Sequence, residues 1–338
     1  MAVTPVPHGR EPLLVILRAL GLGDLLCAVP ALRGLATAFP HHHRVLAAPL
    51  ALEPLLSMIA TPEGAPVVHE LTDCAPLGGL DDRLGRPDVA VNLHGAGPQS
   101  HRVLLERRPR RLLAFSHPDV PESALGPSWR AGEHEVLRWC RMLEGHGVAC
   151  RPGSLSIRAP AAPAVARGAL GATVLHPGAG SAARRWPPRA WSVVARRERD
   201  RGREVLVSGG PGEVALARNV AHDAGLPADR VLAGTTDLAQ LAALVGAAGR
   251  VVCGDTGVAH LATALGTPSV VLFGPTAPHE WGPPPGRARH RVLWAGKRGD
   301  PHGRRPDPGL LEITVDEVLS ALTALDEHAG ALTASRAA

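Results

Sequence analysis

Short apolar runs alternate with amphipathic stretches along nearly the whole chain, and this alternation is the pattern that most restricts its fold. Parallel strands need a crossover between them, so such alternation favours an α/β architecture with parallel sheets. Strands are expected at residues 13–17, 45–48, 67–71, 89–93 and 112–115, and again at 173–176, 204–208, 231–233, 250–253 and 270–273. Helices are expected at 24–38, 50–59, 99–107, 133–144, 189–199, 213–224, 238–247, 258–265 and 315–325.

A Pro- and Ala-rich stretch, 151–168, interrupts the alternation and predicts an interdomain linker. Each half opens with an apolar strand, a loop of small residues and a helix, so we expect two Rossmann-like domains facing each other across a cleft. The first domain is expected at 1–160 and the second at 169–312. Residues 275–310 are expected to be mostly loop, and the helix at about 315–330 is free to pack back on the first domain.

The net charge is +5, but the basic residues are scattered along the chain, and the three phenylalanines offer no platform on which bases could stack. Nucleic-acid binding is therefore not expected, whereas attraction to anionic substrates or to a membrane surface is compatible with the charge. No apolar run is long enough for a membrane span, and the start of the sequence lacks a signal peptide's features. We expect a cytoplasmic protein, with the inner membrane face as an alternative.

The five cysteines are odd in number and scattered, without a Cys-x-x-Cys pair, so we expect reduced thiols rather than disulfides or a zinc site. The run His41-His42-His43 has no accompanying carboxylates or cysteines and is interpreted as a polar turn. No Asp-x-Asp occurs, so a metal-bridged diphosphate has no evident ligands. No metal or other cofactor is expected.

The most informative segment is 251–268, an apolar strand followed by Gly254-Asp255-Thr256-Gly257 and directly by a helix. Such a turn places unpaired backbone N–H groups and a positive helix end beside the sheet, which suits a phosphate. His260 follows one turn later. The next strand ends in Gly274-Pro275-Thr276, which should reach the same rim. The alternative is a helix cap and a buried core histidine.

Two further loops follow the first strand of each half. His176-Pro-Gly-Ala-Gly-Ser181 leads to Arg184 and Arg185, and arginine can hold phosphate bidentately. Gly21-Leu22-Gly23-Asp24 opens the first helix, but Leu26 breaks the dinucleotide-binding glycine pattern. Asp24 is either a carboxylate that stabilises the helix N-terminus or a general base. At the end of the fourth strand, Asn92 and His94 have either a ligand-facing or a structural role.

Over residues 13–325 the sequence resembles the heptosyltransferases, family 9 of the glycosyltransferases, which have the GT-B fold. The resemblance rests on Leu22-Gly23-Asp24, on His176-Pro-Gly-Ala-Gly with Arg184-Arg185-Trp186-Pro187, and on Gly254-Asp255-Thr256-Gly257-x-x-His260 before Gly274-Pro275-Thr276. It implies an inverting, metal-independent enzyme that transfers heptose or a related sugar. The donor would be a nucleotide-diphosphate sugar such as ADP-heptose, bound by the domain at 169–312, and the domain at 1–160 would be the acceptor side. The acceptor would be a hydroxyl of a cell-envelope glycan, a lipid-linked glycan or a small molecule.

By this resemblance Asp24 is the catalytic base, Thr256 and Gly257 cradle the diphosphate, and Asp255 and His260 contact the sugar and phosphate. Arg184 stands where the lipopolysaccharide enzymes carry lysine, and Leu20-Gly21 replaces the usual Ser-Ser. The residues assigned to donor and phosphate binding are Gly23, Gly178, Gly180, Ser181, Arg184, Arg185, Asp255, Thr256, Gly257, His260, Gly274, Pro275 and Thr276. The competing functions are a nucleotide-sugar epimerase or hydrolase, and a non-catalytic nucleotide-sugar-binding protein.

Overall fold

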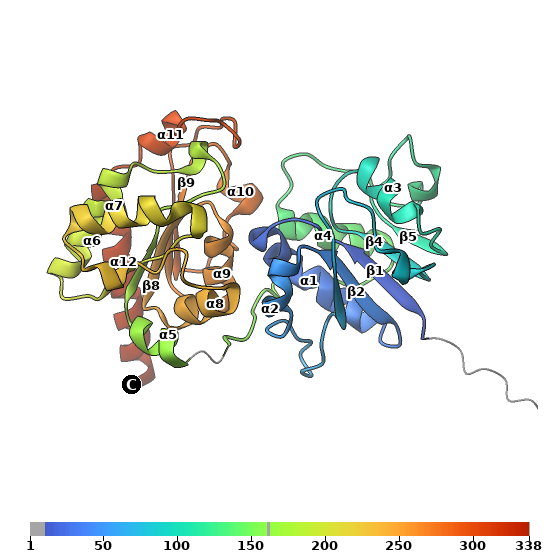
Figure 1. The fold of residues 1–338 in the computed structure, drawn as a ribbon, viewed down its shortest axis with the longest axis horizontal. Coiled ribbons are helices and arrows are strands. Elements are labelled where there is room, and N and C mark those ends of the chain that lie inside the picture. Colours follow the sequence, from blue (N-terminus) through green and yellow to red (C-terminus); the bar gives the residue numbers. More distant parts are fainter. Residues whose placement is uncertain (1–10, 161–162, 338) are drawn as a thin grey trace, which may run out of the picture. The chain divides into compact units, whose positions relative to one another are not determined.

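The computed structural model describes residues 11–160 and 163–337 and divides the chain into two compact units (Figure 1). The first contains residues 11–21 together with Ala28–Ala131 and Val136–Pro152. The second contains Leu22–Cys27, Gly132–Glu135 and the described residues from Gly153 onward. In the described part of the chain, no helix has the length and apolar character needed to cross a membrane.

The first unit is built on a five-stranded parallel sheet in the order β3-β2-β1-β4-β5. Its strands are β1 (Leu13–Leu17), β2 (His43–Ala48), β3 (Glu70–Asp73), β4 (Val89–Asn92) and β5 (Arg111–Leu113). The helices along this part are α1 (Leu22–Ala38), α2 (Glu53–Leu56), α3 (Gln99–Leu105) and α4 (Glu135–Gly145), with short 3-10 turns at Leu50–Leu52, Asp82–Leu84 and Pro121–Ser123. Apolar side chains of the strands, among them Val15, Val45 and Ala90, pack with Leu104 of α3 in a buried core.

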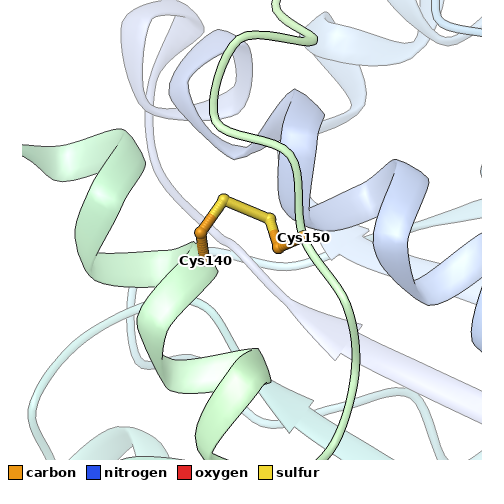
Figure 2. The surroundings of a disulfide bond; sticks show 2 residues. All are labelled: Cys140 and Cys150. Carbon is orange, nitrogen blue, oxygen red and sulfur yellow. A yellow bond between two sulfur atoms is a disulfide. The ribbon is translucent and has the colours of Figure 1, made fainter.

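Two cysteines of the first unit form a disulfide bond, and the expectation of five reduced thiols is wrong for this pair. Cys140 lies on α4 and Cys150 on the segment that follows the helix (Figure 2). Gly147, with φ of +81°, adopts the left-handed conformation that turns the chain back, and this reversal brings the two Cα atoms to 5.1 Å. The remaining cysteines, Cys27, Cys74 and Cys253, are buried and are not disulfide-bonded.

The second unit repeats the architecture with the parallel order β10-β9-β8-β6-β7. The strands are β6 (Thr173–His176), β7 (Val205–Val207), β8 (Arg250–Gly254), β9 (Ser269–Phe273) and β10 (His290–Trp294). The helices are α5 (Pro163–Ala169), α6 (Pro188–Asp200), α7 (Val214–Ala224), α8 (Leu238–Ala247), α9 (Gly257–Leu265), α10 (Pro278–Trp281), α11 (Pro308–Leu311) and α12 (Val315–Ala337). Short 3-10 turns occur at Ala182–Arg184, Pro211–Glu213 and Ala228–Arg230.

The C-terminal helix α12 belongs to the core of the second unit, whereas the sequence left its return to the first domain open. Val318 and Leu322 are buried with Trp191 and Val194 of α6, and α12 also contacts β9 and β10 (Figure 1). The helix therefore completes one face of this sheet.

The strand expected at 231–233 is wrong, and two further expectations for the second unit hold only in part. Residues 231–233 form only a single bridge, from Val231 to Val207, because the chain turns again at Gly234 with φ of +73°. The expected loop at 275–310 contains β10, whose apolar residues pair with β9 despite the surrounding Pro, Gly and Arg. The expected linker contains α5, whose alanines favour the helical conformation.

Both sheets reverse their strand order at an inner pair of strands. In the first sheet this topological switch point lies between β1 and β4, and in the second between β6 and β8. Ligands of open α/β sheets bind beyond the carboxyl ends of the strands at such a point. In the second unit, these ends carry the His176 loop and the Gly254–Gly257 turn.

A buried histidine at the start of β10 makes the stability of the second unit depend on pH. His290 is 8% exposed, and burial, with Arg287 and Arg289 nearby, lowers its pKa to about 4. Because the unfolded chain binds this proton near pH 6.5, the contribution of His290 to stability is complete above that pH and is lost as pH falls toward 4.

We expect the wild-type free energy of unfolding to fall by about 2–3 kcal/mol more than that of His290→Asn between pH 7 and pH 4. Urea titrations at several pH values measure this difference. The control is His222→Asn, because that side chain is 89% exposed. Parallel pH profiles for wild type and His290→Asn would contradict the expectation.

Candidate active site

The N-terminus of α9 supplies the backbone donors of the site. Thr256 is its N-cap: the side-chain oxygen accepts from the Val258 N–H at 3.3 Å, and Gly257 is the first helical residue. Only Asp255 and Thr256 separate the helix from β8, and its C-cap is Gly266, whose φ of +75° is left-handed. Its unpaired N–H groups and positive end therefore point out at the carboxyl edge of the sheet, where they can bind an anion.

Beside this helix start, a buried carboxylate holds a guanidinium group. Asp255 is 6% exposed, and its Oδ2 lies 3.9 Å from Arg184 Nη1, which also donates to the Asp255 carbonyl at 3.3 Å. Burial raises the pKa of Asp255, while Arg184 and a hydrogen bond with Thr276 lower it. The carboxylate thereby orients Arg184, whose side chain remains 26% exposed.

The first turn of α1 packs against the first turn of α9 within the second unit. A Cβ atom on Gly257 would lie 2.9 Å from Leu22 Cβ, and a Cβ atom on Gly23 would lie 2.7 Å from His260 Cδ2. Cys27 Sγ is 3.4 Å from His260 Nδ1. Asp24 stands in the first turn of α1, between Gly23 and Cys27, which both contact His260 of α9. Two helix N-termini and one carboxylate thus meet here.

The loop after β6 encloses a second carboxylate, which the sequence interpretation missed. A Cβ atom on Gly178 would lie 2.1 Å from Glu213 Cδ, so only glycine admits this side chain. Glu213 Oε2 accepts from the Gly210 N–H at 2.8 Å and lies 3.8 Å from His176 Nε2. Burial lowers the pKa of His176, although Glu213 opposes that shift, and its Nδ1 is 3.0 Å from Ser208 Oγ.

Four of the residues assigned to donor binding hold loops in place. Ser181 Oγ donates to the Pro301 carbonyl at 2.6 Å, and Arg185 donates through Nε and Nη2 to the Ala179 carbonyl at 3.0 and 2.9 Å. The Gly274 carbonyl accepts from Trp294 Nε1 at 3.1 Å, and the Pro275 carbonyl accepts from the Gly299 N–H at 3.1 Å. Gly180, in contrast, lies against the guanidinium of Arg184.

In the first unit, Asn92 organises the loop beyond β4. This buried side chain accepts from the His94 N–H at 2.8 Å and donates to Ser100 Oγ at 2.9 Å. The His94 ring is half-buried, and burial together with Arg18 lowers its pKa. In the run 41–43, His43 Nε2 lies 3.2 Å from Glu70 Oε2. Over residues 11–160 and 163–337, no group of three or more His, Cys, Asp or Glu could hold a metal ion.

The geometry suits charge neutralisation at a phosphate. Amides of a helix start, a second helix start and an oriented guanidinium gather around Asp255 and Gly257. Such fixed donors stabilise negative charge that develops during a reaction. Two residues of this region could have been found from the sequence. Glu213 ends the glycine-rich segment Gly209-Gly-Pro-Gly-Glu213, just beyond the second strand of the unit, and Cys27 follows Gly23 by four residues, one helical turn.

The chain is similar to known glycosyltransferases. Residues 150–308 match the model of glycosyltransferase family 9, described as heptosyltransferase. The solved family 9 glycosyltransferase of Veillonella parvula DSM 2008 is 21% identical, with 94% of this chain and 97% of that chain covered and a TM-score of 0.73. No curated protein matches the sequence.

Two Escherichia coli structures are also similar. ADP-heptose lipopolysaccharide heptosyltransferase II is 21% identical, with 93% of this chain and 98% of that chain covered and a TM-score of 0.69. The heptosyltransferase WaaC with ADP-2-deoxy-2-fluoro heptose is 18% identical, with 92% and 98% covered and a TM-score of 0.66. Residues 150–308 are thus similar to glycosyltransferase family 9, and 94% of the chain shares the fold of a solved family 9 structure.

Proposed function

We propose that the protein is an inverting glycosyltransferase that moves heptose, or a related sugar, from a nucleotide-diphosphate donor such as ADP-heptose to an acceptor hydroxyl. The observation that carries the proposal is the meeting of the two helix N-termini, α1 and α9, beside the oriented guanidinium of Arg184. The family 9 match over 150–308 and the ADP-linked heptose analogue bound to WaaC support the choice of donor.

In this proposal the second unit holds the donor. The diphosphate binds the amides of Thr256 and Gly257 and the Arg184 guanidinium, with His260 one turn further along α9. Glu213 lies just beyond the second strand of a Rossmann-like unit, where a carboxylate can accept from ribose hydroxyls. Amides and a guanidinium thus carry the charge neutralisation, and we infer that no metal ion is required.

Asp24 is the proposed general base. Its carboxylate takes the proton of the acceptor hydroxyl while that oxygen forms a bond to the anomeric carbon. The bond from the anomeric carbon to the diphosphate breaks, and its electron pair leaves with the nucleotide. Attack opposite the leaving group inverts the anomeric configuration.

The acceptor is proposed to be a cell-envelope glycan, a lipid-linked glycan or a small molecule, bound at the switch point of the first sheet between β1 and β4. The proposed location is the cytoplasm or the inner face of the membrane. Peripheral attachment to anionic lipids is compatible with the net charge of +5.

A ligand screen followed by product analysis tests this function. ADP-heptose and ADP should raise the melting temperature more than GDP-, UDP- or dTDP-sugars, since a ligand at 100 times its Kd adds about 2.7 kcal/mol. Turnover of ADP-heptose should require an acceptor and should survive EDTA. A changed sugar without acceptor would identify an epimerase, release of free sugar a hydrolase, and binding without turnover a non-catalytic protein.

A further inference from the structure

We propose that Cys27 is a positioning residue: its thiol donates a hydrogen bond to Nδ1 of His260 and so fixes the tautomer of that imidazole. The inference deepens the proposed function, because His260 is there assigned to the donor. Cys27 belongs to none of the sequence motifs and has no part in the charge neutralisation described above. The contact joins α1 to α9 at the point where both helices begin.

The contact between Cys27 and His260 lies in a closely packed part of the second unit. Cys27 Sγ lies 3.4 Å from His260 Nδ1, and Cys27 is 3% exposed. Gly23 precedes Cys27 by four residues, so both face the same side of α1, and a Cβ atom on Gly23 would lie 2.7 Å from the same ring. Trp281 meets the ring edge-on, with centroids 6.0 Å apart. These contacts help to hold the imidazole in place.

The direction of the hydrogen bond decides what the ring can bind. A neutral imidazole has one N–H donor and one acceptor nitrogen. When the thiol donates to Nδ1, the proton of the ring resides on Nε2, and the imidazole offers a donor to an anionic oxygen. In the other tautomer, Nε2 carries a lone pair, which would repel a phosphate. The thiol thus matches His260 to the same ligand that the α9 amides favour.

Three variants separate this role from simple packing. Cys27→Ala removes the donor, Cys27→Ser restores a hydroxyl donor of similar size, and Cys74→Ala is a matched loss of a buried thiol in the first unit. Nitrogen-15 NMR of the nucleotide-free protein, with His260 assigned through His260→Gln, should show the Nε2–H tautomer in wild type, Cys27→Ser and Cys74→Ala. Cys27→Ala should show a mixture of tautomers.

Calorimetry with ADP supplies the second readout. Cys27→Ala should weaken ADP binding about fivefold, and Cys27→Ser should stay within about twofold of wild type, as expected for one hydrogen bond. An unchanged His260 tautomer in Cys27→Ala would overturn the inference, as would equal loss of ADP affinity in Cys27→Ala and Cys27→Ser. If wild type fails to bind ADP, the proposed function fails, while the NMR comparison still decides the role of Cys27.

Discussion

Asp24→Ala is expected to lower the rate of sugar transfer by about 10²–10⁴-fold, the usual contribution of a positioned general base. The same variant should bind ADP within about twofold of wild type, because the diphosphate is assigned to Arg184 and to the amides at the start of α9. The loss should therefore appear in kcat, with the donor KM nearly unchanged. Steady-state kinetics measure kcat and the donor KM, and calorimetry on the same preparation measures the affinity for ADP.

The control must address the other interpretation of Asp24, as a carboxylate that stabilises a helix N-terminus. Asp237 is such a residue, since its Oδ1 accepts from the Gln240 N–H at 2.7 Å at the start of α8. Asp237→Ala should cost about 1 kcal/mol of stability and leave turnover intact. If Asp24→Ala behaves in the same way, then Asp24 is a structural carboxylate and has no part in proton transfer.

The sequence was most informative where one segment determines its own geometry. The apolar run before Gly254 and the helix after Thr256 are close in the chain, so the strand and the helix could be predicted together with the turn between them. The parallel pairing follows from the same alternation, since parallel strands need a crossover between them. The expected strand 173–176 and helix 238–247 coincide with β6 and α8.

Features that depend on distant segments could not be predicted in this way. Glu213 reaches the β6 loop only because Gly178, 35 positions earlier, leaves room for it. Cys140 and Cys150 pair because the chain reverses after α4, which cysteine spacing alone does not reveal. In β10, five residues with a polar start acquire their strand conformation from pairing with β9. Tertiary context outweighs local propensity in each case.

The basic pair after the β6 loop was treated as one motif, yet its members differ in the structure and should differ on substitution. Arg184 lies against Asp255, whereas Arg185 is exposed and donates twice to the Ala179 carbonyl. Arg184→Ala should reduce kcat/KM for the donor about 10²–10³-fold, the loss typical of one fixed group that stabilises developing charge. Arg185→Ala should reduce it by less than about tenfold, through loosening of the loop alone.

Loss of Arg184 should also affect stability, because its guanidinium lies beside the buried carboxylate of Asp255. Burial alone raises the pKa of Asp255, and Arg184 opposes that shift, so removal of the guanidinium leaves the buried carboxylate without its cation. Arg184→Ala should therefore also destabilise the second unit, and Asp255→Asn in the same chain should recover that stability without recovering turnover. Arg184→Lys keeps the charge but not the bidentate geometry, and its turnover should fall between wild type and Arg184→Ala. Equal losses for Arg184→Ala and Arg185→Ala would instead make the pair an ordinary basic surface, and the leaving diphosphate would have to be neutralised by other groups.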